Sequence, residues 1–449
     1  MTLSEIHRAL AESETAPTRS LGQNFLHDQN LARWIVGCLQ IQPGDHVIEI
    51  GPGLGALTEF LAAHDIRLTL IEKDGRLVRG LEEKFRGATT EVVHLDALDY
   101  DLRQTWGKGP VKIVGNLPYY VSTPLIAKFT SALSPASRLV LTLQLELAQR
   151  LNATPRTKDY GAMTVCVSRR WKASYLRKLP ASVFFPVPRV DSAVVALDRR
   201  PADEVRPLDE ALFDSLVRRG FSERRKQLRN LVPELKPKWA DATAALEVPE
   251  TVRAEELSLA QWETLAAIAR PSAAQSGSEM FDVVDERDRV LRAEPREIVH
   301  VNNLRHRAAH MLIFSRGGEL LLQKRSIWKD RNPGHWDSSA AGHVDSGETY
   351  LEAARRELGE ELGIEAPSLE RIGKLAPCEQ TGQEFIEVFR GVHDGPFVPA
   401  PIELETVAFF PMEDVRAWAA GSPQDFSPVF LLCLDLLYQG ERASRPFGR

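Results

Sequence analysis

Three glutamates crowd into one short stretch of the chain. Glu357, Glu360 and Glu361 stand at positions i, i+3 and i+4, so on a helix their carboxylates lie on one face. Like charges at this spacing destabilise a helix unless a cation lies between them, and carboxylate oxygens suit Mg²⁺ or Mn²⁺. The spacing therefore predicts a metal site able to neutralise phosphates and activate water. A solvated acidic helix is the alternative interpretation.

A glycine-rich turn near the N-terminus indicates different chemistry. The apolar run His46–Ile50 ends in Gly51-Pro-Gly53-Leu-Gly55, and such a turn lets the backbone approach a ligand and begin a helix. Glu72 ends the next apolar run, where a carboxylate can bond a ribose diol. Asp96 ends the third run and could accept a hydrogen bond from an adenine amino group. Each feature taken singly is a weak signal, because many strand-to-helix turns contain such residues.

The tetrapeptide Asn116-Leu117-Pro118-Tyr119 follows the fourth apolar run. The exocyclic amine of adenine is a poor nucleophile, because its lone pair is delocalised into the ring. The amide oxygen of Asn116 and the carbonyl of Leu117 could accept its hydrogens and favour a pyramidal nitrogen. Pro118 constrains the turn, and Tyr119 offers a face on which the base can stack. An ordinary Asn/Pro turn is the alternative.

These polar motifs follow a regular series of expected strands. Strands that alternate with helices predict an open, mostly parallel α/β sheet, in which ligands bind beyond the carboxyl ends of the strands. The segment from about Pro207 to Ala269 has helical periodicity, Arg270–Ser278 has linker composition, and a new α+β pattern begins near Met280. The expected strands are His46–Ile50, Arg67–Ile71, Glu91–Leu95, Val111–Val114 and Arg138–Leu145. We expect domains at 1–200, 201–270 and 280–449, with a linker at 271–279.

Length and composition limit the kind of protein. A chain of 449 residues is too long for one ordinary domain. A net charge of −6 argues against a uniformly basic nucleic-acid coat but allows a local basic patch. The four cysteines have no metal or disulfide spacing, which suits a reducing cytoplasm. No apolar run approaches the ~20 residues of a membrane span, and the first residues lack a signal-peptide core. We expect a cytoplasmic protein with no membrane partner.

Residues from about 17 to 270 resemble the ribosomal RNA adenine-N6 dimethyltransferases. The matching motifs, in order, are Leu21-Gly-Gln-Asn24-Phe-Leu26, Glu49-Ile-Gly51-Pro-Gly53-Leu-Gly55, Glu72, Asp96, Asn116–Tyr119, Phe184–Ala193 and Gly220–Asn230. The resemblance implies a Rossmann-like methyltransferase fold with a small helical domain. It also implies a binding site for S-adenosylmethionine formed by Asn24, Leu26, Gly51, Gly53, Glu72, Asp96 and Asn116.

The same resemblance implies a substrate. Members of this family methylate two adjacent adenosines near the 3′ end of 16S small-subunit ribosomal RNA, so the implied partner is a 30S subunit precursor. A related branch modifies 23S RNA and confers antibiotic resistance. Leu117, where that branch tends to have Ile, and the two late motifs favour the small-subunit branch.

RNA binding requires positive charge, because phosphate contacts supply much of the affinity. The first candidate cluster is Arg218, Arg219, Arg224, Arg225, Lys226 and Arg229. The second is Arg169, Arg170, Lys172, Arg177 and Lys178. Two clusters that flank a base-methylating site favour RNA contact; a solvated basic face is the alternative.

The segment from Gly342 to Ile364 resembles the Nudix box, and every defined position of that box is filled. The resemblance covers roughly residues 280–437 and implies a fused α/β/α-sandwich Nudix domain. It implies Mg²⁺ or Mn²⁺ held chiefly by Glu357 and Glu361, with help from Glu360. Arg356 would orient a neighbouring carboxylate such as Glu348.

Glycines and a distant carboxylate complete the implied hydrolase site. Gly342 and Gly347 would shape the loop before the helix, and Gly363 fits its C-terminal cap. The catalytic pair would be Glu360 and a base from a distant loop, for which Glu403 is the first candidate. Glu384 and Glu387 are the next candidates.

Three further segments resemble the branch of this superfamily that includes isopentenyl-diphosphate isomerase: Phe281–Asp285, Leu321–Arg325 and Pro333–Asp337. The isomerase uses a cysteine just before the box, whereas this chain has Ser338-Ser-Ala-Ala341. The expected reaction is therefore hydrolysis of a nucleoside diphosphate derivative. Two alternatives stay open: an isomerase, and a ribosome-assembly factor whose Nudix half only binds RNA or a nucleotide.

Overall fold

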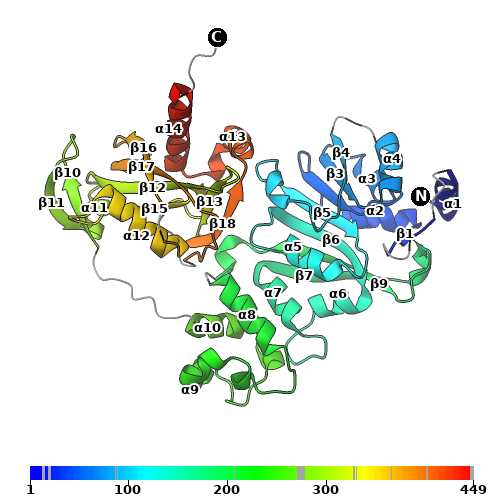
Figure 1. Cartoon of the computed structure of the whole chain (residues 1–449). Helices are drawn as coiled ribbons and strands as arrows, with labels where there is room; N and C mark the ends of the chain where they lie inside the picture. The colour runs from blue at the N-terminus through cyan, green and yellow to red at the C-terminus, as the bar shows by residue number, and fades with distance from the viewer. Residues whose placement is uncertain are drawn as a thin grey trace, which may run out of the picture. The chain divides into compact units, whose positions relative to one another are not determined.

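The computed structural model describes most of the chain. The described residues are 1–12, 16–18, 22–85, 87, 89–206, 208–269, 279–326, 329, 331–365, 367–400 and 403–444. They form two compact units, the first comprising residues 1–205 and 211–269 (Figure 1). The predicted linker lies outside the described residues, apart from Glu279. No helix in the described parts is long and apolar enough to cross a membrane.

The first unit is built on a seven-stranded sheet in the order β4-β3-β2-β5-β6-β9-β7. The first five strands are parallel, and β9 and β7 are added by antiparallel pairing. The mostly parallel sheet was predicted, and the five expected strands are present. Their bounds are β2 His46–Ile50, β3 Arg67–Glu72, β4 Thr90–His94, β5 Val111–Asn116 and β6 Ala136–Gln144. The two unpredicted strands are β7 Trp171–Leu179 and β9 Ser192–Arg199.

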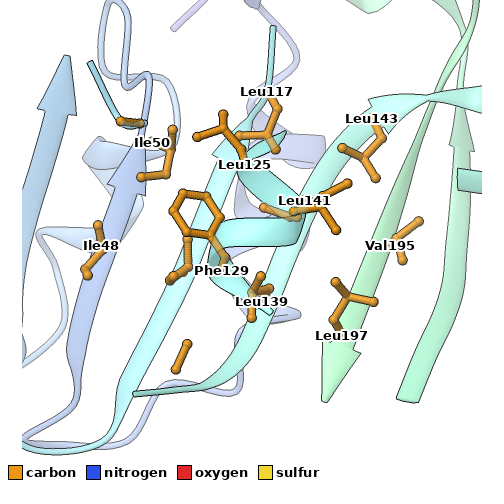
Figure 2. Close-up of a cluster of buried hydrophobic side chains, with 14 of the residues drawn as sticks. Ile48, Ile50, Leu117, Leu125, Phe129, Leu139, Leu141, Leu143, Val195 and Leu197 are labelled. Carbon is orange, nitrogen blue, oxygen red and sulfur yellow. The ribbon is translucent and has the colours of Figure 1, made fainter. Parts of the chain in front are cut away.

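Apolar layers cover both faces of this sheet. Ile48 and Ile50 of β2 lie in one cluster with Phe129 of α5 (Ser122–Phe129), as Figure 2 shows. Val47, which points the other way, packs with Ile35 of α2 (Gln29–Gly37). Strands that are buried on both faces read as continuous apolar runs, which is why the sequence located them. The rigid core fixes the strand ends that carry the polar motifs.

A short ribbon joins two distant parts of the first unit. β1 (Phe25–Leu26) pairs with β8 (Phe184–Phe185), so Phe25 lies opposite Phe185. The N–H of His27 also donates to the carbonyl of Val183 at 3.1 Å. The segment that carries Asn24 is therefore held in place by residues almost 160 positions later. The other α-helices before residue 90 are α1 (Leu3–Glu12), α3 (Thr58–Leu61) and α4 (Gly75–Lys84).

The predicted helical segment is present. Its helices are α8 Glu210–Gly220, α9 Trp239–Ala245 and α10 Leu259–Ala269, and α6 Leu145–Leu151 and α7 Ala162–Arg170 precede them. α8 and α10 pack closely where Gly220 meets Trp262, since a Cβ on Gly220 would lie 2.5 Å from the indole ring. This contact requires glycine for steric reasons.

The second unit contains a seven-stranded mixed sheet. Its main path is β14-β13-β12-β17-β16, while β15 pairs with β12 and β18 pairs with β13. The bounds are β12 His306–Phe314, β13 Leu320–Arg325, β14 Trp336–Asp337, β15 Ala340–His343, β16 Glu370–Leu375, β17 Glu384–Val392 and β18 Leu404–Phe410. A separate hairpin joins β10 (Met280–Val284) to β11 (Val290–Pro295). The helices are α11 Arg296–Val301, α12 Tyr350–Leu362, α13 Met412–Gly421 and α14 Pro428–Ser444.

Helix α12 begins and ends with strong local signals. Thr349 and Glu352 form a reciprocal capping box at its N-terminus, and Gly363 adopts a left-handed C-cap with φ of 65°. The capping role predicted for Gly363 is confirmed. Leu358 and Leu362 bury one face of the helix against the sheet core. This packing determines which direction the glutamates of α12 face.

Candidate active sites

A cavity opens at the carboxyl ends of β2, β3 and β5 in the first unit. About 120 Å³ of it is accessible to water, and it opens to solvent at its mouth. All seven residues predicted to bind the cofactor line it: Asn24, Leu26, Gly51, Gly53, Glu72, Asp96 and Asn116. The structure therefore brings together residues that are up to 92 positions apart.

The glycine turn forms one wall of this cavity. Gly51 and Gly53 have φ of 63° and 60°, a region that residues with a Cβ rarely adopt. A Cβ on Gly53 would lie 3.0 Å from the Phe25 ring. The N–H of Gly53 donates to Oε2 of Glu72 at 3.1 Å. The turn thus keeps its backbone open to a ligand while anchoring the neighbouring carboxylate.

Two buried carboxylates face this cavity. Glu72 accepts hydrogen bonds from the N–H groups of Gly53 and Asp74, the latter at 2.8 Å. Glu49 accepts a hydrogen bond from the Thr58 hydroxyl at 2.7 Å. It had no separate role in the sequence-based prediction beyond its place in the glycine-turn motif. Burial raises the pKa of Glu72. Burial, partly opposed by the Thr58 bond and reinforced by Glu72, raises the pKa of Glu49 to about 8. Its position as the first residue of the acidic-x-Gly turn was the available sequence signal.

Asp96 sits at the adjoining strand end. Its Oδ2 pairs with the Lys73 ammonium at 2.6 Å, and its Oδ1 accepts from the Leu98 N–H at 3.0 Å. Burial opposes ionisation of Asp96, but these two donors hold its pKa below the ordinary value. Lys73 was missed, because an exposed lysine after a strand carries no distinctive sequence signal.

The Asn116 tetrapeptide lies beside the cavity. The Asn116 side-chain N–H donates to the carbonyl of Asn24 at 2.8 Å, which orients the amide and leaves its oxygen for another donor. Leu117 is buried, and its N–H donates to the carbonyl of Thr142. The Tyr119 hydroxyl pairs with Ser192 at 2.9 Å. Pro118 and the 56% exposed Tyr120 line the cavity; sequence reasoning did not single out Tyr120.

The first predicted basic cluster lies largely at the surface. Four of its members pair with carboxylates: Arg219 with Glu234, Arg224 with Glu255, Lys226 with Glu223 and Arg229 with Glu250. Arg218 and Arg225 are exposed, and no carboxylate of the described residues is within ion-pair distance of them. Exposed pairs of this kind contribute little to stability, so the four basic side chains can release their carboxylate partners and bind phosphates instead.

The second basic cluster is only partly at the surface. Arg169 is 2% exposed, pairs with Glu263 at 3.3 Å and lies over the Phe213 ring. Arg170 is also buried. The prediction that these two arginines contact RNA is therefore wrong, because both side chains are buried in the protein interior. Lys172, Arg177 and Lys178 on β7 are exposed.

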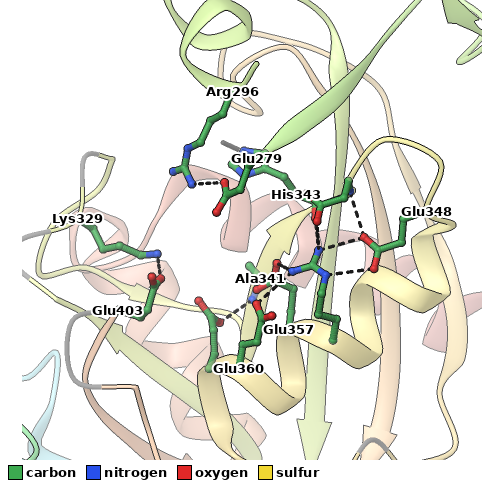
Figure 3. A network of polar contacts seen from close by, with 12 residues as sticks. Glu279, Arg296, Lys329, Ala341, His343, Glu348, Glu357, Glu360 and Glu403 are labelled. Carbon is green, nitrogen blue, oxygen red and sulfur yellow. Dashed lines mark hydrogen bonds and ion pairs between the residues drawn. The ribbon is translucent and has the colours of Figure 1, made fainter. Parts of the chain in front are cut away.

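Helix α12 forms the candidate metal site of the second unit. Glu361 is buried and accepts a hydrogen bond from the Ala341 N–H at 3.0 Å. The side chain of Glu357 is 13% exposed and that of Glu360 is 62% exposed. Figure 3 shows Glu357 and Glu360 on the same helix. Burial, with the charge of Glu361, raises the pKa of Glu357 to about 8. Burial also raises the pKa of Glu361 to about 7. A divalent cation would fit between these two adjacent carboxyls, because its charge offsets the burial and mutual repulsion that oppose their ionisation.

Arg356 organises these carboxylates. Its Nε and Nη2 bind both oxygens of Glu348 at 3.1 and 3.0 Å, the predicted partnership. Its Nη1 donates to Glu357 at 2.7 Å and to Glu360 at 3.2 Å. Gly342 makes room for Glu357, since a Cβ there would lie 1.9 Å from the Glu357 carboxyl carbon.

The three candidates for the distant base occupy different surroundings. Glu403 pairs with Lys329, and both groups influence the pKa of Glu361, so Glu403 lies near the α12 carboxylates (Figure 3). Glu384 instead pairs with Arg331 and two histidines. Glu387 pairs with Arg371 at 2.9 Å. The geometry favours Glu403 among the three.

A group of imidazoles was missed by the sequence reasoning. Ligand atoms of His300, His306 and His343 lie within 4.8 Å of one another, and Glu384 Oε1 lies 3.5 Å from the Nε2 atoms of His306 and His343. His306 Nδ1 lies 2.8 Å from the carbonyl of Leu304, which favours a free lone pair on Nε2. Burial lowers the pKa of His343, and that of His300 to about 4, so both are neutral. His300, His306 and His343 lie on α11, β12 and β15, so no local spacing in the sequence indicated that they meet.

Comparisons with known proteins agree with this division of the chain. A family model described as ribosomal RNA adenine dimethylase matches residues 16–270, and one described as NUDIX domain matches residues 304–430. The chain is 39% identical over 259 residues to ribosomal RNA small subunit methyltransferase A of Alkaliphilus metalliredigens, covering 55% of this chain and 90% of that protein. The methyltransferase of the same name from Lactiplantibacillus plantarum is 39% identical over 260 residues, covering 55% and 88%. A crystal structure of a dimethyladenosine transferase from Plasmodium falciparum aligns with a TM-score of 0.46 and 24% identity, covering 54% and 95%.

Proposed function

We propose, for a chain that belongs to the ribosomal RNA adenine dimethylase family, that its first unit uses S-adenosylmethionine to dimethylate two adjacent adenosines near the 3′ end of small-subunit ribosomal RNA. The observation that carries this proposal is the cavity lined by all seven residues of the cofactor set, including Asn116, which is also the predicted amide acceptor. The cofactor would supply an electrophilic methyl group. The open glycine turn and acidic walls suit a nucleoside with positive charge.

Each residue of the site has a specific task in this proposal. Glu72 would bind the ribose hydroxyls and Asp96 the adenine amine of the cofactor. The amide oxygen of Asn116, oriented by its bond to Asn24, would accept a hydrogen from the target amine. The Leu117 carbonyl would accept the second hydrogen, Pro118 would fix the turn, and Tyr119 would stack on the base. The amine would then present its lone pair toward the methyl group.

The test compares two RNA substrates. We expect transfer of labelled methyl groups to undermethylated 30S particles and not to 23S RNA, lost in Asn116→Ala and kept in Asn152→Ala at the end of α6. Methylation of 23S RNA alone would instead establish the resistance-type alternative. Activity of Asn116→Ala near that of the wild type would exclude the proposed amide acceptor.

We propose that the second unit, a Nudix domain, hydrolyses a nucleoside diphosphate derivative with Mg²⁺ or Mn²⁺. Bound metal would neutralise phosphate charge and acidify a water molecule. Glu357 and Glu361 would hold it from the buried face of α12, and Glu360 would assist from the exposed edge. Glu403, which pairs with Lys329, would accept a proton from the water. Arg356 would keep Glu357 in place through its fork to Glu348.

The second test measures phosphate release with Mg²⁺ over a panel of nucleoside diphosphate derivatives. Glu361→Gln should abolish release, while Glu365→Gln, an exposed glutamate just after the helix, should not. Both variants should keep methyl transfer, which verifies the first unit, and should unfold thermally like the wild type, which verifies the second. No turnover by the wild type would favour the assembly-factor alternative, and conversion of isopentenyl diphosphate would establish the isomerase.

The imidazole group favours a second cation. Three imidazoles with a carboxylate suit Mn²⁺ or Zn²⁺ better than Mg²⁺, and we propose that His300, His306, His343 and Glu384 hold such an ion. Metal analysis of the purified full chain should show one bound transition-metal ion, lost in His306→Asn. An equal metal content in this variant would exclude the site.

A further inference from the structure

Glu49 is the most enclosed acidic group of the cofactor cavity. It is the fourth residue of the buried strand β2, is separated from the glycine turn by Ile50 alone, lines the cavity and is 2% exposed. One oxygen accepts the Thr58 hydroxyl at 2.7 Å. The proposed cofactor contacts do not use it. A buried carboxyl without an assigned role needs an explanation, because burying a charge without a partner is costly.

The surroundings of Glu49 indicate that its carboxyl is protonated in the absence of a cationic ligand. Glu72, facing it from β3, accepts two backbone N–H groups, which stabilise its negative charge. Asp96 is already paired with the Lys73 ammonium. Thr58 from α3 and Asn116 from β5 are uncharged. With two carboxyls close together, the proton remains on the one with fewer donors, and the pKa of Glu49 is raised to about 8 by burial.

We propose that Glu49 is a specificity-determining residue that releases its proton to solvent when the sulfonium cofactor binds and regains one after methyl transfer. The cavity would thereby distinguish S-adenosylmethionine from S-adenosylhomocysteine by charge. This inference rests on the proposed methyltransferase function. It assigns to Glu49 a direct electrostatic response to the ligand.

The charges balance through the cycle. In methyl transfer the sulfur–carbon bond breaks, the nitrogen–carbon bond forms, and sulfur keeps the bonding electrons and becomes neutral. The target amine loses one proton, which leaves to solvent. Glu49 then binds one proton from solvent, because the cation that favoured its carboxylate form has disappeared.

The expected response is large enough to measure. A unit charge at roughly 6 Å, the range over which a neighbouring charge shifts a pKa directly, favours the carboxylate form by about a hundredfold at an effective dielectric of about 20. Starting from a carboxyl that is about one-tenth ionised at pH 7, binding should release about 0.8 of a proton. The affinity for the cationic cofactor, relative to the neutral product, should rise about 25-fold between pH 6 and pH 8.

The experiment is isothermal titration of the full chain with both ligands in buffers of different ionisation enthalpy. We expect the sulfonium ligand to release about 0.8 of a proton more than S-adenosylhomocysteine at pH 7. An analogue with an ammonium group in place of the sulfonium should behave like the cofactor. Glu49→Gln, which keeps an acceptor for Thr58, should remove the difference in proton release. Glu82→Gln, at an exposed position of α4, should keep that difference.

The outcomes separate this inference from the function beneath it. Equal proton release by both ligands, or an unchanged difference in Glu49→Gln, would overturn the role of Glu49 while leaving the methyltransferase intact. A difference lost only in Glu72→Gln would assign the proton to that residue and equally overturn the inference. Failure of the wild type to bind either ligand would overturn the proposed function itself.

Discussion

Gly342→Ala should disable the Nudix site without disturbing the fold. Gly342 lies in β15, and the added methyl would stand 1.9 Å from the carboxyl carbon of Glu357 and 2.0 Å from its Oε1. The backbone at this position is not in the left-handed region, so alanine itself introduces no dihedral strain. The perturbation is therefore confined to the glutamate.

The size of the displacement can be worked from the contact. Carbon atoms pack at about 3.5 Å, so the Glu357 carboxyl must move by roughly 1.5 Å. It cannot simply rotate into solvent, because it is only 13% exposed and is held by Arg356 at 2.7 Å. Displacing a metal ligand by this amount should weaken Mg²⁺ binding at least as much as losing a supporting residue, about 10- to 100-fold. That corresponds to about 1.4–2.7 kcal/mol.

Titration of the metal-free full chain with Mg²⁺ or Mn²⁺, followed by phosphate release, measures the effect. Gly359→Ala is the matched control. Gly359 lies on α12 together with Glu357, and among the described residues the added methyl would meet the Ile364 carbonyl at 3.9 Å. This substitution should stabilise α12 slightly. Wild-type metal affinity in Gly342→Ala would refute the argument that this glycine exists to admit Glu357. Equal losses in both variants would do the same.

Three further predictions follow from the described contacts. Arg356→Lys keeps the charge but loses the fork to Glu348, so hydrolysis should fall about tenfold or more; unchanged kcat would contradict this. The pKa values of Glu357 and Glu361 are raised to about 8 and about 7, above the unfolded value of 4.5. The metal-free folded state therefore binds more protons than the unfolded chain, and its free energy of unfolding should fall as pH rises from about 5 to 8. Added Mg²⁺ should reverse the fall, which thermal unfolding with and without chelator measures. Finally, Arg218→Glu with Arg225→Glu should weaken RNA binding and reduce its logarithmic salt slope by about 2; an unchanged slope would place the RNA surface elsewhere.

The sheet of the first unit was predictable because its parallel strands are buried on both faces. His46–Ile50 was predicted with the bounds that β2 has, and the polar residues at the strand ends do line one cavity. The antiparallel strands β7 and β9 were not predicted. β7 is an edge strand with exposed basic residues, so its sequence lacks a continuous apolar run.

The failures at the sites have a common physical origin. Arg169 resembles a surface cation in the sequence, yet Glu263 and Phe213 make its burial possible, and both come from distant segments. The imidazole group depends on three separate elements meeting. The raised pKa of Glu49 depends first on its burial and then on the nearby Glu72. Such properties belong to tertiary packing and have no local periodicity or spacing.

The β1–β8 ribbon has a consequence for protein synthesis. Phe25 and Phe185 must pair before the segment carrying Asn24 is fixed, and at about 5–20 residues per second the ribosome needs roughly 10 to 30 s to make the chain between them. Late in that interval the glycine turn and Glu72 have been synthesised, but one wall of the pocket is missing. A nascent chain should therefore remain unable to hold the cofactor until residues near 185 emerge.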